Sequence, residues 1–340
     1  MATDQTLPPE KEDLLRQFVT CFVEYPVVTK IYEDFDRLRY NHRLGGEQQC
    51  MLLTGDAGSG KSMLVKNYQQ HFSKASQGGY SHNPLLFSRI PSRPTLSATI
   101  LQLIRDLGQD SAARVQRRSS DIYLTDVLVQ SLIKYGIELI VIDEFQELVE
   151  YKTDRKRTEI ANRLKLVSEK ARISIVLVGM PWAKKITEEP QWASRLMIRR
   201  QIPFFKISEE RDNFVRFLMG LANRMPLLET PRLQEKHTVF ALFSVCKGCL
   251  RILKYFLNEA LKLALLDDAP TLQKEHLSRT FVMLHPEKTN PFKQNIDELL
   301  VSEVKEYSRY DEGATHSEDA VIPTQFTDRL PISMLLKKSR

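Results

Sequence analysis

The stretch GDAGSGKS, residues 55–62, constrains the fold of this chain more than any other feature. It fits the pattern G-x-x-x-x-G-K-[ST], whose glycines let backbone N–H groups wrap around a phosphate without intervening Cβ atoms. The apolar run QQCMLLT precedes it, and KSMLVKNYQQHF follows with helical spacing. A strand, a glycine-rich turn and a helix in this order predict a phosphate-binding loop in an α/β domain.

A second motif, ELIVIDE, supplies two carboxylates at the end of a buried strand. Ligands of open α/β sheets bind at the carboxyl ends of strands, so Asp143 and Glu144 are expected beside the phosphate-binding loop. Asp143 would hold magnesium through its water shell, and Glu144 would orient the attacking water. The alternative is an acidic pair that only caps the next helix.

The two motifs together predict ATP and Mg2+ as cofactors. Lys61 would reach the β and γ phosphates, and the hydroxyl of Ser62 would join Asp143 at the metal. We predict Lys61 and Glu144 as catalytic residues. The predicted nucleotide-binding residues are Gly55, Asp56, Ala57, Gly58, Ser59, Gly60, Lys61, Ser62, Met63 and Asp143.

A short apolar segment before the second lead-in helix is a candidate for contact with the adenine. Tyr25, Pro26, Val27 and Val28 form it. Val27 and Val28 are included among the predicted nucleotide contacts. Packing into the ordinary core explains the same residues equally well.

The order of elements predicts the domain organisation. Strand and helix patterns alternate up to residue 207, which indicates a parallel sheet flanked by helices. Only helical periodicity follows, which indicates a small all-α lid domain. We expect a tail without apolar pattern, with a possible helix at IDELLVSEVKEY. The predicted ranges are a helical lead-in (1–45), an α/β nucleotide-binding domain (46–207), a lid (208–285) and a partly disordered tail for partner docking (286–340).

Composition narrows the class of protein only slightly. Apolar content of 42%, charged content of 27% and a net charge of +6 suit a globular protein and permit a nucleic-acid partner. No run approaches the roughly 20 apolar residues of a membrane span, and the N-terminus lacks a signal-peptide pattern. We therefore expect a cytoplasmic protein. Cys246 and Cys249, in a CxxC without a second pair, are expected to be core residues rather than metal ligands.

The motifs in combination resemble a known family. FVEYPVVTKIYEDFDRL, LLTGDAGSGKSMLVKNY, ELIVIDEFQEL and ISIVLVGMP are similar to the TniB/TnsC group of AAA+ ATPases. These proteins are ATP-dependent regulators of DNA transposition, related more distantly to the Mu B protein and to helicase loaders. The resemblance covers roughly residues 15 to 265. It implies a bacterial protein that assembles on duplex DNA as a ring or helical filament, with nucleotide between subunits.

The resemblance also implies arginines that act on the nucleotide. A basic residue of one subunit completes the neighbouring site in such assemblies, and Arg195 in QWASRLMIRRQI occupies that position, with Arg199 and Arg200 behind it. An arginine on an amphipathic helix surface is the alternative. Arg251 in GCLRIL matches the lid position that senses the γ-phosphate. Met180 stands where the family often has Thr, so we expect slow hydrolysis.

The family threads duplex DNA past loops that lie before the ELIVIDE strand. In this chain the matching segments are IPSRPTLSATI and ARVQRRSS. Arginine forks and hydroxyls grip phosphate oxygens without reading sequence. The predicted DNA-binding residues are Arg93, Thr95, Arg117, Arg118 and Ser119, and a solvated charged loop is the alternative.

These features favour an ATPase that oligomerises on target DNA, is nucleoid-associated when bound, and recruits or activates a transposase. A target-selection protein is a further expected partner. The C-terminal PISMLLKKSR is a candidate docking segment, and a frayed terminus without function is the alternative. Two alternatives remain. One is a STAND-like signalling switch that never binds DNA, and the other is a helicase-loader-type replication ATPase.

Overall fold

The computed structural model describes residues 7–75, 83–92, 94–108, 120–150, 154–314 and 320–335. The chain divides into two compact units. The sheet unit comprises residues 27–202 and 308–323, and the helical unit comprises residues 1–26, 203–307 and 324–340. Each unit has its own cluster of buried apolar side chains.

The sheet unit is built on five parallel strands in the order β2-β3-β4-β1-β5. Strands β3 and β4 are buried along their whole length, as the near-continuous apolar runs LIVID and SIVLVG require of central strands covered on both faces. The prediction of a parallel sheet flanked by helices is confirmed. The strands are β1 (Met51–Gly55), β2 (Leu85–Arg89), β3 (Leu139–Asp143), β4 (Ser174–Gly179) and β5 (Ile198–Ile202).

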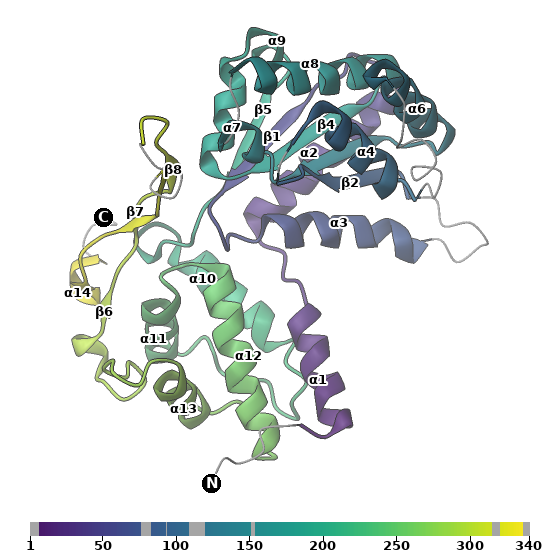
Figure 1. Cartoon of the computed structure of the whole chain (residues 1–340). Coiled ribbons are helices and arrows are strands. Elements are labelled where there is room, and N and C mark those ends of the chain that lie inside the picture. The colour runs from purple at the N-terminus through teal and green to yellow at the C-terminus, as the bar shows by residue number, and fades with distance from the viewer. Residues whose placement is uncertain are drawn as a thin grey trace. The chain divides into compact units, whose positions relative to one another are not determined.

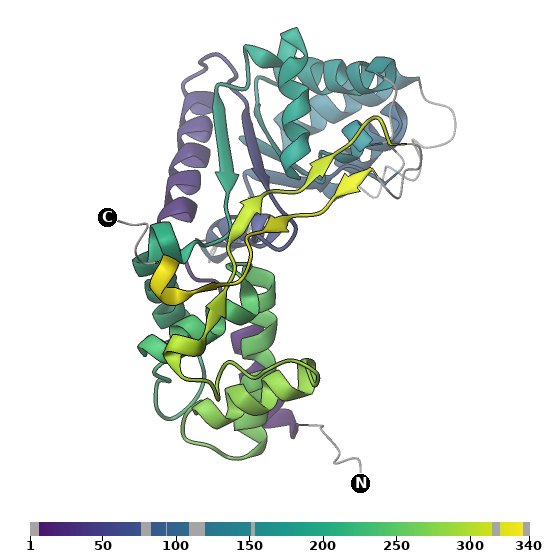
Figure 2. The same ribbon diagram turned by 90° about the vertical axis from the view of Figure 1, so that its left-hand side faces the viewer.

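Helices cover both faces of this sheet (Figures 1 and 2). Figure 2 shows α2 on one side and the layer of α4, α6 and α8 on the other. Thr95 and Ser120 cap α4 and α6, since their hydroxyls accept the N–H groups of Ala98 and Tyr123. The helical segments are α2 (Pro26–Arg43), α3 (Lys61–Ala75), α4 (Leu96–Asp106), α6 (Asp121–Lys134), α7 (Glu147–Glu150), α8 (Asp154–Ala171), the 3-10 helix η1 (Pro181–Glu188) and α9 (Pro190–Ala193).

The helical unit packs around aromatic side chains. Phe214 meets Phe243 edge to face at 5.3 Å between ring centroids, and Phe256 stacks on Phe292 at 5.6 Å. The helical segments are α1 (Pro9–Thr20), α10 (Ile207–Ala222), α11 (Lys236–Cys246), α12 (Leu250–Leu266), α13 (Lys274–Leu284), η2 (Ile296–Glu298) and α14 (Ile332–Leu335). The short strands are β6 (Leu300–Val301), β7 (Val304–Glu306), β10 (Gln325–Phe326) and β11 (Leu330–Pro331).

The predicted lead-in of residues 1–45 does not form a unit of its own. Helix α1 belongs to the helical unit, where Phe18 is fully buried and Lys11 donates to the carbonyl of Leu265 at 2.7 Å. Helix α2 belongs to the sheet unit, because Phe35 packs on Tyr68 of α3 at 5.1 Å between centroids. The two predicted lead-in helices exist, but each is held by a different core.

The predicted tail of residues 286–340 also differs from expectation. Its described parts form antiparallel strand pairs, β6 with β11, β7 with β10, and β8 (Arg309–Tyr310) with β9 (Val321–Ile322). The prediction of a helix in IDELLVSEVKEY is wrong except for the single turn η2. Val301 and Val304 lie instead in strands that pair with β11 and β10. Ile332 of the candidate docking segment is buried in the helical unit, whereas residues 336–340 lie outside the described part. The lid boundaries of 208–285 are therefore too narrow, and 308–323 joins the sheet unit.

The sequence predicts that the chain has no membrane span and that the two CxxC cysteines are core residues. Within the described ranges, no helix is both long and apolar enough to span a bilayer. Cys246 and Cys249 are buried, as expected of core residues, and burial raises the pKa of the Cys246 thiol to about 12. The described residues contain no group of three or more His, Cys, Asp or Glu side chains arranged to hold a metal.

Candidate nucleotide-binding site

The loop between β1 and α3 has the backbone that a phosphate cradle requires. Gly58 and Gly60 have φ values of +84° and +96°, in the left-handed region that favours glycine. A Cβ on Gly55 would meet the Ser59 hydroxyl at 2.7 Å and the Ile202 carbonyl at 2.9 Å. The Ser59 hydroxyl is buried and has no hydrogen-bond partner among the described residues. The loop is thus tightly closed on itself and keeps an unsatisfied polar group, which suits a phosphate ligand.

The first turn of α3 brings the two sequence motifs into contact. The Ser62 hydroxyl donates to Asp143 Oδ2 at 2.6 Å across 81 positions of sequence. Asp143 is 5% exposed and ends β3. A serine hydroxyl and a carboxylate are oxygen ligands of the kind that Mg2+ prefers, so these two residues fit a magnesium site.

Lys61 lies at the N-terminus of α3 and faces the loop carbonyls. Its ammonium group donates to the carbonyl oxygens of Gly55 at 2.6 Å and Asp56 at 3.0 Å. The sulfur of Met180 lies 4.0 Å from the same nitrogen. The ammonium group therefore lies between the loop and the end of β4, close to where the phosphates of a nucleotide would enter.

Glu144 is held in an unusual backbone conformation directly after Asp143. Its φ is +56°, and its N–H donates to Asp143 Oδ1 at 2.9 Å. A side chain in this region costs roughly 1–2 kcal/mol, and such strain is concentrated at functional sites. The Glu144 side chain is 38% exposed, with Arg89 Nη2 3.9 Å from Oε1. The side chains of Asp143 and Glu144 thus have different neighbours, Ser62 for the first and Arg89 for the second.

Gln146 is a site residue that the sequence analysis missed. Its Nε2 donates to Glu144 Oε2 at 2.6 Å, and its Oε1 accepts the N–H of Met180 at 3.1 Å. A glutamine two positions after an acidic pair is not a motif by itself. Gln146 makes these two contacts only because the end of β4 lies beside the end of β3.

Ser308 is a second missed residue, and it contacts the second residue of the phosphate-binding loop. Its hydroxyl and N–H both donate to the carboxylate of Asp56, which is 1% exposed. No sequence pattern links position 308 to position 56. Of the other predicted loop contacts, Ala57 is exposed and Met63 is 43% exposed.

Two further carboxylates, Glu147 and Glu150, follow Glu144 and are affected by its charge. Burial raises the pKa of Glu147, and the charges of Glu150 and Glu144 raise it further. Burial raises the pKa of Glu150 as well, although the indole N–H of Trp182 donates to it at 2.9 Å and opposes the shift. Negative charge is thus concentrated beyond the end of β3, where a cation is favoured.

The proposed adenine contacts lie in packed surroundings. Val28 is 1% exposed within α2, and Val27 is partly buried. Tyr25 belongs to the helical unit, where its ring packs on Phe205 at 5.3 Å, and burial raises the pKa of its hydroxyl. The core interpretation describes Val28 and Tyr25 well, and nothing in the geometry singles out an adenine contact.

The three candidate trans arginines have different surroundings. Arg195 pairs with Glu169 at 2.5 Å, and Arg200 pairs with the buried Asp34 at 2.6 Å. Arg199 is exposed on the edge strand β5, where its Nε donates to the carbonyl of Leu196 at 3.1 Å.

Arg251 is exposed in the first turn of α12 in the helical unit.

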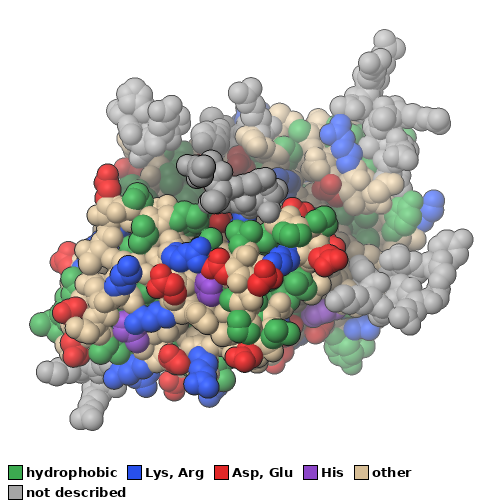
Figure 3. Space-filling view, turned by 90° about the horizontal axis from the view of Figure 1, so that it is seen from below, with side chains coloured by type: hydrophobic (Ala, Val, Ile, Leu, Met, Phe, Trp, Pro, Cys, Tyr) green, Lys and Arg blue, Asp and Glu red, His purple; other side chains and the backbone are tan. Residues whose placement is uncertain are grey.

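Over the face of the molecule shown in Figure 3, acidic and basic side chains are interspersed. That face therefore presents no single-sign surface. Of the predicted DNA contacts, Arg93, Arg117, Arg118 and Ser119 lie outside the described residues, and Thr95 caps α4.

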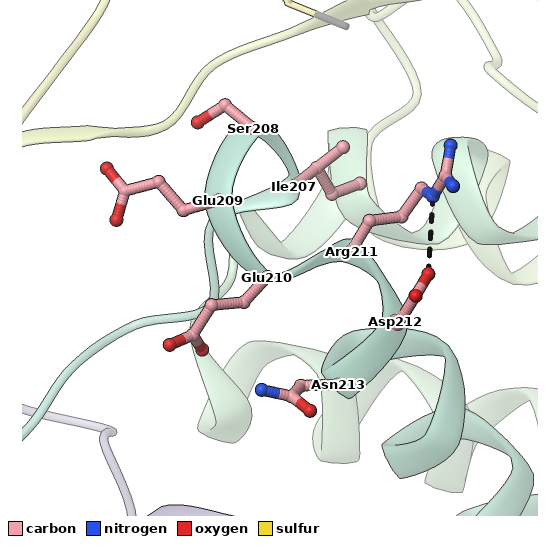
Figure 4. A pocket seen from close by; sticks show the side chains of 7 residues that line it. All are labelled: Ile207, Ser208, Glu209, Glu210, Arg211, Asp212 and Asn213. Atoms are coloured by element: carbon pink, nitrogen blue, oxygen red, sulfur yellow. Dashed lines mark ion pairs between the residues drawn. The ribbon is translucent and has the colours of Figure 1, made fainter. Parts of the chain in front are cut away.

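A hollow of about 340 Å³ lies at the start of α10 in the helical unit (Figure 4). Its lining is residues 207–213, which include three carboxylates and one arginine paired with its neighbour Asp212. The backbone leaves the helical region at Glu210, which explains the opening. A lining with this excess of negative charge does not suit phosphate, so the phosphate-binding loop remains the candidate site.

Comparisons with known proteins bear on the family and the fold of the chain. A scan of protein families matches residues 17–205 to the family described as "Bacterial TniB protein". No curated protein matches the chain in sequence.

Solved structures show the fold. The ORC2 protein of Aeropyrum pernix, solved as ADPNP–ADP complexes, has a TM-score of 0.60 at 20% identity, covering 83% of this chain and 75% of that one. Cdc6p of Pyrobaculum aerophilum has a TM-score of 0.57 at 13% identity, covering 78% and 69%. The ORC1 protein of A. pernix in complex with DNA has a TM-score of 0.52 at 16% identity, covering 84% and 68%. The chain has the AAA+ fold that these proteins share.

Proposed function

Because the chain belongs to the family of bacterial TniB proteins, we propose that it is an ATP-dependent regulator of DNA transposition that assembles on duplex DNA. The observation that carries the ATPase part is the contact between Ser62 and Asp143, which joins the phosphate-binding loop to the acidic strand end. The A. pernix ORC2 structures, which hold ADPNP and ADP, support nucleotide binding by this fold. The proposed location is the bacterial cytoplasm, with nucleoid association when the protein is bound to DNA.

The side chains divide the chemistry of ATP hydrolysis among them. Lys61 would exchange its bonds to the loop carbonyls for the β and γ phosphates, and Ser62 and Asp143 would hold Mg2+. A bound Mg2+ ion supplies charge neutralisation at the phosphates. Glu144 would orient the attacking water, since phosphoryl transfer depends on positioning more than on covalent chemistry. The proposed hydrolysis is slow, because Met180 offers no hydroxyl to the attacking water at the end of β4.

Neighbouring copies would complete the site. We propose Arg195 as the arginine that reaches the nucleotide of the next subunit, with Arg199 as the alternative because it is exposed on the edge strand. Arg195 would have to leave its ion pair with Glu169, an exchange of modest cost at a partly exposed site. Arg251 is proposed to sense the γ-phosphate. Assembly into a ring or filament is therefore part of the proposed catalytic cycle.

Duplex DNA is the proposed partner of the two arginine-containing loops before β3. Arg93, Thr95, Arg117, Arg118 and Ser119 are the proposed contacts, through phosphates rather than base edges. The A. pernix ORC1 structure in complex with DNA supports a DNA-bound role for this fold. A transposase and a target-selection protein are the proposed protein partners.

The test is nucleotide-dependent assembly on DNA. Purified protein is examined by sedimentation and electron microscopy with a non-hydrolysable ATP analogue, with duplex, with single-stranded DNA and without DNA. We expect rings or filaments that need both analogue and duplex, that are lost in Lys61→Ala and that are weakened in Arg117→Ala. Arg216→Ala, an exposed arginine of the helical unit, is the charge-matched control. Assembly that does not depend on DNA would indicate a signalling switch, and assembly that requires single-stranded DNA would indicate a replication loader.

A further inference from the structure

We infer that Gln146 is a positioning residue that sets the carboxylate of Glu144 by linking it to the main chain at the end of β4. The inference rests on the proposed ATPase function and extends it to the control of the same site. Both ends of the Gln146 amide are used, the nitrogen for Glu144 Oε2 at 2.6 Å and the oxygen for the N–H of Met180 at 3.1 Å. At 6% exposed, Gln146 makes these bonds out of bulk water, where they are stronger.

The end of β4 is shaped to receive this amide. A Cβ on Gly179 would meet Gln146 Oε1 at 2.9 Å and the Gln146 backbone nitrogen at 3.2 Å. The absence of a side chain at Gly179 therefore leaves the space that the amide occupies. Met180 has no polar side-chain group for Glu144, so the Gln146 amide provides a side-chain link between the two strand ends, beside the backbone bond from the N–H of Phe145 to the carbonyl of Val178.

Among the described residues, Arg89 and Gln146 compete for the Glu144 carboxylate, and the two contacts differ in strength. Arg89 reaches Oε1 only at 3.9 Å and is 68% exposed, so solvent and salt screen that ion pair. Gln146 holds Oε2 at 2.6 Å from a buried position. The amide therefore fixes the direction of the carboxylate, whereas the guanidinium group adds a weak and reversible restraint.

Met180, the main-chain partner of Gln146, also lies beside Lys61 of the phosphate-binding loop. Met180, whose N–H the amide accepts, has its sulfur 4.0 Å from Lys61 Nζ. A phosphate that moves the Lys61 ammonium group acts on the residue to which Gln146 is bonded. Gln146 and Lys61 thus contact the same residue, Gln146 at its main chain and Lys61 at its side chain.

The variant that tests this is Gln146→Glu. It keeps the shape and the acceptor for the Met180 N–H, but it replaces the donor to Glu144 with a second carboxylate. Two carboxylates at hydrogen-bond distance do not both ionise easily, so the pKa of one carboxyl group of the pair is raised. A residue that only fills space would show no such coupling to Glu144.

We measure single-turnover ATP hydrolysis from pH 5.5 to 8.5, together with ATP affinity. We expect Gln146→Glu to lose about 10- to 100-fold in rate at pH 8 with ATP affinity within about threefold of the wild type, and to regain rate as pH falls, when a shared proton restores the donor. Gln102→Glu is the matched control, because Gln102 also donates to a carboxylate, Asp106, at 3.0 Å but on α4. It should leave the rate and its pH dependence unchanged.

An unchanged rate profile in Gln146→Glu beside an active wild type and an inactive Glu144→Gln overturns the inference alone. A wild type that binds ATP without hydrolysing it overturns both this inference and the proposed function.

Discussion

The hydroxyl and the backbone N–H of Ser308 both donate to the carboxylate of Asp56, with the N–H 3.1 Å from Oδ2. The two residues are 252 positions apart in sequence. The bonds attach the segment after β7 to the second residue of the phosphate-binding loop. Nearby, the Tyr310 hydroxyl donates to the carbonyl of Glu150, and its ring stacks on Trp182 at 6.3 Å. A late segment of the chain is therefore part of the support of the nucleotide site.

Removal of the Ser308 hydroxyl should loosen this support. Ser308→Ala removes one hydrogen-bond donor to a buried carboxylate, at a cost of about 1–3 kcal/mol in the free energy of unfolding. Urea denaturation measures this cost, and hydrogen exchange should show faster exchange in residues 308–314. Ser244→Ala is the control, because Ser244 donates only to the carbonyl of Ala241 within its own helix. Equal stability and equal exchange in wild type and Ser308→Ala would contradict this account of the contact.

The stability of the helical unit should depend on the charge of His276. Its Nδ1 accepts the N–H of Gln273 at 3.0 Å, and burial lowers its pKa more than the charge of Asp267 raises it. Between the lowered pKa and 6.5 the unfolded chain binds more protons, so stability is present above pH 6.5 and is lost as pH falls. The unfolding free energy of wild type should fall from pH 7.5 to 5.5, and His276→Gln should show a smaller slope. Identical slopes would show that His276 does not titrate on unfolding.

Subunit mixing separates the candidate trans arginines. Arg195→Ala should keep ATP affinity but lose about a thousandfold in hydrolysis by the assembled protein, a loss typical of a trans arginine. Lys61→Ala keeps its arginine but cannot use its own site. Mixing these two inactive variants should restore part of the activity, because some interfaces then combine an intact loop with an intact arginine. If Arg199→Ala behaves this way and Arg195→Ala does not, the exposed arginine of β5 is the acting residue.

The sheet unit could be predicted from sequence because its signals are local. Apolar runs such as LIVID place strands in the sheet interior, and Gly58 and Gly60 of the loop have the positive φ values that favour glycine. Since parallel strands end at one edge, the meeting of Ser62 and Asp143 also followed from the two motifs. These predictions needed only the order of elements along the chain.

The remaining features depend on distant contacts and could not be predicted. Ser308 reaches Asp56 only because residues 308–323 return to the sheet unit. The segment IDELLVSEVKEY fits helical spacing on its own, yet Val301 and Val304 pair with strands that follow about 20 to 30 residues later. Gln146 carries no signal in sequence, because its partner Met180 follows β4, which lies far from Gln146 in sequence.

The central claim is that the loop at 55–62 and the carboxylates at 143–144 form one ATP-hydrolysing site. The most direct measurement is ATP binding and Mg2+-dependent hydrolysis by wild type, Lys61→Ala and Glu144→Gln in parallel. The account predicts that wild type binds and slowly hydrolyses ATP, that Lys61→Ala binds it at least tenfold more weakly, and that Glu144→Gln binds it normally with hydrolysis reduced at least tenfold. Wild-type hydrolysis that survives unchanged in Glu144→Gln would contradict it.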